Sequence, residues 1–255
     1  MELHPLARRG FADVADDYER GRPDYPPEAV RLLGLPAGAR ILDLAAGTGK
    51  LTRVLRAAGF DVVPVEPLPG MRARVDGALE GTAEAIPLPD ASVDGATVAD
   101  AWHWFDHARA GDELARVVRP GGPVAILWQW PTGEDLPEWS QVLGEILGPR
   151  RRDHPGFGGR MVSLGEHPAF EPHTEHAVRF AYETDRERYL AFVASISYVA
   201  SLPPAQRDDV LRRVGALLPD GPFSIPYKTG VWLTRRRERS SRKVNIAEGD
   251  RHPRG

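Results

Sequence analysis

Short apolar runs alternate with helically spaced apolar positions along most of this chain of 255 residues. The runs near 40–44, 61–65, 93–98 and 123–129 are typical of buried strands, and helical spacing occurs between most of them, near 50–58, 68–78 and 108–118. The run near 93–98 hardly alternates, as expected for a strand covered on both faces of a sheet. This order predicts an α/β fold with a doubly wound, mostly parallel sheet.

The segments on either side of this pattern predict a cover and a cap. A short helix from Pro27 to Leu33 belongs to an N-terminal cover of about residues 1–34. Toward the other end, the pattern predicts strands at 175–182 and 223–233 and helices at 186–200 and 204–218. We expect one domain over residues 1–238, with its cap helices at about 185–219.

A tight turn of small residues joins the first strand to the first long helix. The turn runs from Ala45 to Gly49, directly before the helically spaced segment that starts at Lys50. Such a turn brings backbone N–H groups and a helix N-terminus to a ligand. Asp43 lies just before the turn, and Glu66 ends the next strand, where its carboxylate can accept both hydroxyls of a ribose.

Three kinds of nucleotide site compete for this turn. A phosphate-binding Walker loop is excluded, because Leu44 stands where it needs a glycine and Leu51 follows Lys50. A dinucleotide fingerprint begins well at Gly47 and Gly49, but Thr52 occupies the place of its third glycine. The remaining pattern is Asp-x-Ala-x-Gly-x-Gly, followed by an acidic residue at the end of the next strand.

These segments resemble the class I S-adenosylmethionine-dependent methyltransferases, in their small-molecule branch. Residues 41–52 are similar to the family's first motif, with Ala45 in place of the more usual glycine, and residues 65–67 are similar to the second. Residues 81–94 resemble the segment on the adenine side. The segment 11–26 and the run His103–Asp106 resemble the trans-aconitate methyltransferase-like subgroup. The resemblance implies a Rossmann-like sheet of seven strands, with the last strand antiparallel.

The resemblance also implies S-adenosylmethionine as the cofactor and a set of residues that contact it. Glu66 would bind the ribose, and Met71 either covers the adenine or belongs to a helix core. Thr82 stands where many relatives have an aspartate that contacts the adenine, so the Ala83 backbone and the Glu84 side chain would recognise that edge instead. The complete predicted set is Asp43, Ala45, Gly47, Gly49, Glu66, Pro67, Met71, Ala83, Glu84 and Asp100.

The acceptor site is predicted at the carboxyl end of the strand near 93–98, where open α/β sheets bind ligands. Trp102, His103 and Trp104 follow this strand. An imidazole can act as a general base near neutral pH, so His103 is the candidate catalytic residue, unless His103 is a packed structural side chain and the tryptophans belong to the core. Tyr18 and Arg22 of the cover are further candidates for substrate binding, and an arginine there could pair with the methionine carboxylate.

Composition narrows the function further. The chain has no cysteine, which excludes disulfides and zinc–thiolate sites, and no metal site is predicted. Its net charge is −3, but residues 235–255 carry +5, so the remainder carries −8, which argues against a surface for nucleic acid. We expect residues 239–255 to form a disordered basic tail, and the Arg-rich segment 149–160 to be either a lid or a solvated loop.

The sequence therefore predicts a methyltransferase that acts on a small molecule at an oxygen, nitrogen or carbon atom. No apolar run approaches the length of a membrane span and no signal peptide is evident, so we expect a cytoplasmic location and no membrane partner. Two alternatives stay open: an NAD-dependent oxidoreductase and a cofactor-binding regulator without catalysis. Oligomeric state and the identity of the acceptor do not follow from the sequence.

Overall fold

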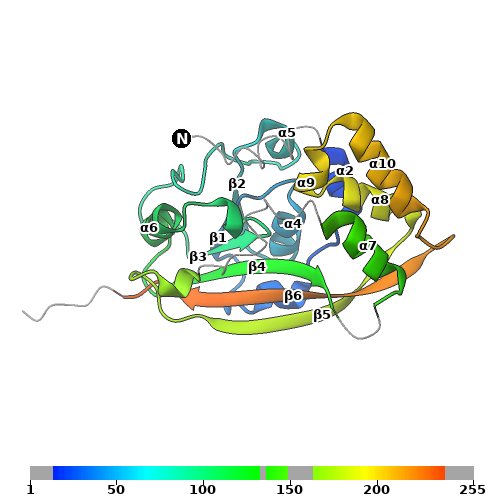
Figure 1. Cartoon of the computed structure of the whole chain (residues 1–255). Helices are drawn as coiled ribbons and strands as arrows, with labels where there is room; N and C mark the ends of the chain where they lie inside the picture. The colour runs from blue at the N-terminus through cyan, green and yellow to red at the C-terminus, as the bar shows by residue number, and fades with distance from the viewer. Residues whose placement is uncertain (1–13, 133–135, 149–162, 239–255) are drawn as a thin grey trace, which may run out of the picture.

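A sheet of six strands forms the centre of the protein. The computed structural model describes residues 14–132, 136–148 and 163–238. The strands are β1 (Arg40–Leu44), β2 (Asp61–Val65), β3 (Gly95–Ala99), β4 (Pro123–Pro131), β5 (Thr174–Thr184) and β6 (Phe223–Arg235). Their order is β2-β1-β3-β4-β6-β5 (Figure 1). Strands β1 to β4 are parallel to one another, and β6 is antiparallel to both of its neighbours, as predicted for the last strand.

Over residues 14–132, 136–148 and 163–238, the sheet has six strands, where seven were expected. At the outer edge of β2, a single parallel bridge joins Val65 to Leu79. The Leu79 N–H donates to the Pro64 carbonyl at 2.9 Å, and the Leu79 carbonyl accepts from the Glu66 N–H at 3.0 Å. Nearby Gly77 has a left-handed φ of 73°, which a strand does not accommodate, so the pairing stops after one bridge.

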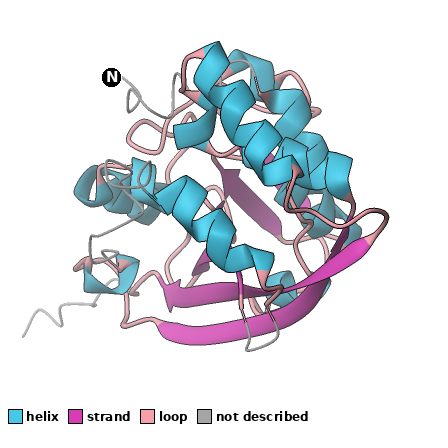
Figure 2. Ribbon diagram, turned by 45° about the vertical axis from the view of Figure 1, so that its right-hand side comes forward, coloured by secondary structure: helices cyan, strands magenta, loops and turns pink. Residues whose placement is uncertain are grey.

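Alternation along the parallel strands separates two apolar cores. Leu42 and Leu44 of β1 pack with β2 side chains in one core, which the helix α6 (His107–Val117) covers. Ile41 packs in the other core, together with residues of α3 (Pro27–Arg31) and α4 (Lys50–Ala57). Because successive side chains of a strand point to opposite faces, one short apolar run supplies both cores. Figure 2 shows helices on both sides of the strands.

Two helices are shorter than the sequence pattern predicted. The helix expected at 68–78 is only α5 (Pro69–Arg72). The helix expected at 186–200 is divided into α8 (Arg186–Ala194) and α9 (Ser197–Ala200). Between them, Ile196 is extended, with a φ of −69° and a ψ of 124°. The Ser195 hydroxyl donates to the Phe192 carbonyl at 2.8 Å, which closes the end of α8.

A helical cap forms a third core beside β5 and β6. It contains α8, α9, α10 (Pro204–Gly215) and α7 (Trp139–Leu147), a helix that the sequence pattern did not predict. Their apolar side chains pack with Tyr182 of β5 and Ile225 and Tyr227 of β6. The cap helices gather on one side of the molecule (Figure 1). The predicted basic tail at 239–255 and the Arg-rich segment at 149–160 lie outside the described residues.

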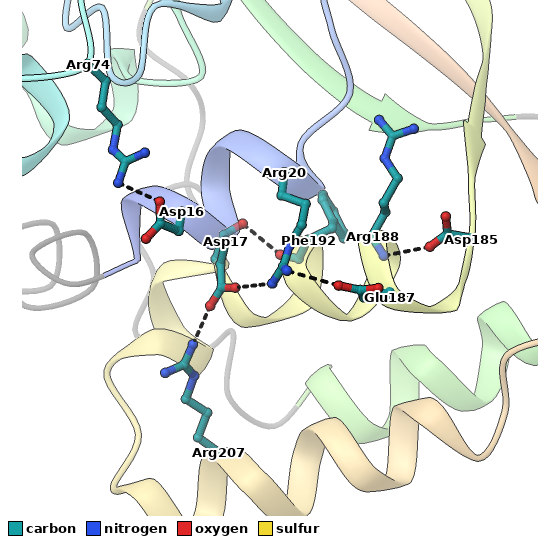
Figure 3. Close-up of polar contacts among 10 residues, drawn as sticks. Asp16, Asp17, Arg20, Arg74, Asp185, Glu187, Arg188, Phe192 and Arg207 are labelled. Carbon is teal, nitrogen blue, oxygen red and sulfur yellow. Dashed lines mark hydrogen bonds and ion pairs between the residues drawn. The ribbon is translucent and has the colours of Figure 1, made fainter.

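The cover helix α2 (Ala15–Gly21) is fastened to the cap (Figure 3). Asp17 forms an ion pair with Arg207 of α10 at 2.8 Å, and Arg20 forms one with Glu187 of α8 at 3.1 Å. At the end of α2, Gly21 lies against α8 so closely that a Cβ atom would be 2.0 Å from the Phe192 nitrogen. Helix α2 of the cover is therefore packed directly on the cap.

Candidate functional site

The turn after β1 is held in a left-handed backbone conformation. The φ angles of Ala45, Gly47 and Gly49 are 57°, 59° and 85°. Glycine adopts this region at no steric cost, whereas an alanine there is strained. No atom lies within 4 Å of the place that a Cβ on Gly47 would occupy. The turn therefore leaves open space directly over its backbone, as a cradle for a ligand requires.

Glu66 joins the end of β2 to this turn. One carboxylate oxygen accepts the Gly47 N–H and the other accepts the Leu68 N–H, each at 2.9 Å. The side chain is buried, which raises the pKa of Glu66, while the two backbone hydrogen bonds oppose that rise. A carboxylate has about four acceptor sites, so both oxygens keep capacity for the hydroxyl groups of a ligand.

Asp43 is buried beneath the turn and does not line the cleft described below. Its carboxylate accepts a hydrogen bond from the Thr52 hydroxyl of α4 at 2.6 Å and another from the Thr97 hydroxyl of β3 at 3.2 Å. Burial raises the pKa of Asp43 to about 6, although both hydrogen bonds lower it. The side chain thus connects β1, α4 and β3 and fixes the turn from below.

A cleft lies above the turn, at the carboxyl ends of β1 to β3. It encloses about 100 Å³, and its lining includes Tyr18 of the cover helix. This volume is below the roughly 300–1,000 Å³ that ligand pockets commonly enclose. Six of the predicted cofactor residues line it: Ala45, Gly47, Glu66, Pro67, Met71 and Asp100. Leu68 and Phe105 line it as well and were not predicted.

Asp100, at the end of β3, is a strained residue at the inner end of the cleft. Its φ is 48°, a left-handed value that is uncommon outside glycine. The Tyr25 hydroxyl donates to one carboxylate oxygen at 2.6 Å and the Gln129 N–H to the other at 3.1 Å. Burial raises the pKa of Asp100. The two donors hold the carboxylate in one orientation despite the backbone strain.

A second cavity of about 560 Å³ adjoins the cleft. Tyr18, Asp100 and Trp104 line both spaces and so form a common wall. His103 lines the second cavity, with its ring centroid 4.7 Å from that of Trp104 and 4.6 Å from that of Trp128. The cavity thus combines aromatic side chains with an imidazole, next to the turn that is shaped to hold a ligand.

Comparison with known proteins identifies the family. A methyltransferase domain family matches residues 42–126. An uncharacterized methyltransferase of Mycobacterium tuberculosis is 44% identical over 233 residues, which cover 86% of this chain and 92% of that relative. The chain is a class I S-adenosylmethionine-dependent methyltransferase.

Solved structures agree with this family. A proposed type II methyltransferase from Anaeromyxobacter dehalogenans has a TM-score of 0.59 and 26% identity, over 85% of this chain and 97% of that one. A Haemonchus contortus phosphoethanolamine N-methyltransferase, solved with S-adenosylhomocysteine, shares the fold with a TM-score of 0.54 and 14% identity, over 93% of this chain and 61% of that one. The cofactor of the methyltransferase is S-adenosylmethionine, so the oxidoreductase and the non-catalytic regulator are set aside.

Several predicted site residues of the methyltransferase lie away from the two cavities. Trp102 is 2% exposed, packs in the core against α6, and stacks on His107 with a centroid distance of 5.0 Å. This agrees with the alternative that Trp102 belongs to the core, and Trp102 does not line the acceptor cavity. Ala83 is buried in the same core. The Glu84 carboxylate accepts the Asp106 N–H at 3.0 Å, at the start of α6.

Two more predicted residues support the site from its edges. Gly49 precedes α4, and a Cβ on it would lie 3.0 Å from the Val75 side chain, so its small size serves packing. Arg22 lines the larger cavity, where its guanidinium lies 5.1 Å from the Tyr18 ring centroid and 5.0 Å from that of Phe192. Its Nε donates to the Ser195 hydroxyl at 3.0 Å, which ties the cover to α8.

Three tyrosines of the larger cavity, Tyr18, Tyr25 and Tyr227, have raised pKa values. Burial raises the pKa of Tyr18 to about 12, and it also raises the pKa values of Tyr25 and Tyr227 above their ordinary range. Their hydroxyls therefore keep their protons. Within the part of the chain that the structure describes, no cluster of histidine and carboxylate side chains suits a metal ion, and no helix is long and apolar enough to cross a membrane.

Proposed function

We propose that this methyltransferase methylates a small molecule bound in the 560 Å³ cavity, with S-adenosylmethionine in the adjoining cleft. The observation that carries the proposal is the common wall of the two spaces, formed by Tyr18, Asp100 and Trp104. Because the two spaces share these residues as lining, a methyl donor in the cleft and an acceptor in the cavity would meet beside them, with the nucleophile in line with the methyl group. We also propose that residues 1–238 form a single domain, in which cover and cap enclose the acceptor.

The residues of the cleft fit the cofactor. Glu66 would accept the two ribose hydroxyls, and Gly47 would let the methionine part approach the backbone. Pro67 and Met71 would cover the adenine, while Asp100 would lie where the cleft meets the acceptor cavity. The bound cofactor supplies an already activated methyl group. The remaining task of the protein is therefore to orient the acceptor and to exclude water.

His103 is the proposed general base. It lines the acceptor cavity between two tryptophan rings, and an imidazole can take a proton from an acceptor hydroxyl or amine near neutral pH. Burial raises the pKa values of Tyr18 and Tyr25 in the same cavity, so these two hydroxyls keep their protons at this pH and do not compete for that role. His103→Ala should lower turnover about 100-fold while cofactor affinity is kept. A folded variant with unchanged turnover would exclude the role.

The test of the function uses a labelled methyl group. The full chain is incubated with labelled S-adenosylmethionine and a cell extract, which is then separated into small molecules, protein and nucleic acid. Label among the small molecules, identified by mass, is the expected result. Label only in protein or nucleic acid would overturn the small-molecule assignment.

Calorimetry tests the cofactor residues separately. S-adenosylmethionine and its demethylated product should bind, and NAD should not. Glu66→Ala should weaken binding of S-adenosylmethionine by about 1.5–3 kcal/mol, or roughly 10- to 150-fold in Kd. An unchanged Kd in a folded Glu66→Ala variant would remove Glu66 from the cofactor site.

A further inference from the structure

The acceptor cavity collects an unusual share of the aromatic residues. Ten of its 21 lining residues are Phe, Tyr or Trp, and the whole chain contains 20 such residues. Aromatic residues make up 8% of the sequence, so a surface of average composition would present about two of them in a lining of this size. This concentration defines the chemistry that the cavity offers to an acceptor.

The sheet supplies one group of these rings. Trp128 and Trp130 are alternate residues of β4, and Tyr227 and Trp232 belong to the neighbouring strand β6. The Trp130 and Trp232 rings are stacked, with centroids 6.1 Å apart and an interplanar angle of 24°. Stacking with each other keeps both rings in fixed orientations, so this side of the cavity is a rigid aromatic surface.

Helices of the cover and cap supply the second group. Tyr189 and Phe192 of α8 are stacked with a centroid distance of 5.4 Å, and Tyr198 comes from α9 and Tyr18 from α2. The space between these helices and the sheet is therefore bounded by rings from both sides. Aromatic rings prefer offset-stacked or edge-on partners, and a flat ring system can meet such rings on both of its faces.

The charged groups of the cavity have partners within the protein. The Lys50 ammonium lies 2.9 Å from the Asp24 carboxylate, and the Asp100 carboxylate accepts from the Tyr25 hydroxyl at 2.6 Å. The Arg22 guanidinium is held by Ser195 and by two aromatic rings, and its positive charge acts on the Asp100 carboxyl, whose pKa it lowers. A buried charge on the acceptor would need a free opposite charge to offset its desolvation, and these groups are already engaged.

We infer that the acceptor is a flat, uncharged aromatic molecule that is bound between the aromatic residues of the sheet and those of the cover and cap. This inference rests on the proposed function of the cavity. The volume of about 560 Å³ lies within the range of drug-sized ligand pockets, so the acceptor has the size of a fused ring system rather than of a single short chain.

The experiment compares three probes of one carbon skeleton. The full chain is saturated with S-adenosylhomocysteine, so that no turnover occurs, and is titrated calorimetrically with 2-naphthol, decahydro-2-naphthol and 3-hydroxy-2-naphthoate. The saturated alcohol has the same skeleton without the aromatic rings, and the naphthoate adds one negative charge. 2-Naphthol should bind about tenfold more tightly than either, because only it both stacks and remains uncharged.

A matched pair of variants localises the effect. Trp128→Leu removes a ring of the cavity and should reduce the preference for 2-naphthol over its saturated analogue from about tenfold to below about threefold. Trp139→Leu removes a tryptophan that packs edge-on against Tyr189 and does not line the cavity, so it should keep the preference. If a variant does not fold, the comparison of the three probes on the wild-type chain still tests whether the acceptor is aromatic and uncharged.

The outcomes separate this inference from the function beneath it. Equal or tighter binding of the saturated alcohol would overturn the aromatic acceptor. Tighter binding of the naphthoate would overturn the uncharged acceptor and assign Arg22 to an acidic group. If S-adenosylhomocysteine itself did not bind, the proposed function would fail, whereas its binding without any preference among the probes would overturn the acceptor class alone.

Discussion

Substitution of Gly21 by alanine tests the contact that unites cover and cap. The added Cβ would lie 2.0 Å from the Phe192 nitrogen and 2.5 Å from the Ala191 carbonyl carbon, both backbone atoms of α8. Helix backbone cannot move aside as a flexible side chain does, so α2 must shift outward. That shift would also break the hydrogen bond from the Tyr182 hydroxyl to the Gly21 carbonyl.

The magnitude follows from two contributions. Overpacking costs about 1–3 kcal/mol, and the lost hydrogen bond about 1 kcal/mol more. A total of about 3 kcal/mol corresponds to a fall of roughly 6–12 °C in Tm for a protein of this size. Because Tyr18 lies on the same helix and lines the cofactor cleft, the Kd of S-adenosylmethionine should rise as well.

Gly144→Ala is the matched control for Gly21→Ala. Gly144 lies within α7, and no atom lies within 4 Å of the place that its Cβ would occupy. This substitution should stabilise the protein by about 0.5–1 kcal/mol, the usual gain for glycine to alanine within a helix. Thermal unfolding and calorimetry measure both variants. A Gly21→Ala variant with wild-type Tm and wild-type cofactor Kd would refute the rigid contact between α2 and α8.

Three further predictions concern the turn and its supports. Ala45→Gly should raise the free energy of unfolding, measured in urea, by about 0.5–1 kcal/mol, because the relief of left-handed strain at residue 45 exceeds the gain in entropy of the unfolded chain. A lower free energy of unfolding would show that Ala45 is not strained. Burial raises the pKa of folded Asp43 to about 6, so the stability of the protein falls as pH rises from about 4 through 6. Asp43→Asn should lessen this fall, measured as Tm against pH. A variant whose Tm depends on pH as in the wild type would contradict this. Tyr25→Phe should lower the free energy of unfolding by about 1–3 kcal/mol, and by less when Asp100 is already replaced by Asn. If the effects of the two substitutions are additive in this double-mutant cycle, the hydrogen bond between Tyr25 and Asp100 is contradicted.

Local features of the site could be predicted from the sequence. The strand, turn and helix around Gly47 follow from residues that are adjacent in the chain, and the structure places them as predicted. The proximity of Glu66 to Gly47 followed from strand order, since the carboxyl ends of neighbouring parallel strands meet at one edge of a sheet. In the structure a hydrogen bond of 2.9 Å joins these two residues.

Features that depend on tertiary packing could not be predicted in this way. Trp102 and Trp104 are two residues apart in a short 3₁₀ turn. Trp102 packs in the core against α6, whereas Trp104 lines both cavities, and this difference depends on tertiary packing. The rings of Tyr189 and Phe192 reach the cavity because α8 packs on α2, more than 150 residues away in the sequence. The high density of aromatic residues between Phe180 and Tyr198 was the available signal for them.

The position of β6 has a consequence for how the chain folds during synthesis. Among the described residues, β5 pairs in the sheet only with β6, and β6 also supplies the second partner of β4. During synthesis, β4 and β5 therefore each keep an unpaired edge until Phe223–Arg235 has left the ribosome. Exposed strand edges promote aggregation, and Trp128 and Trp130 lie on one of these edges. Ribosome stalling before residue 223 should thus produce a nascent chain that recruits chaperones, and release of the last strand should end that dependence.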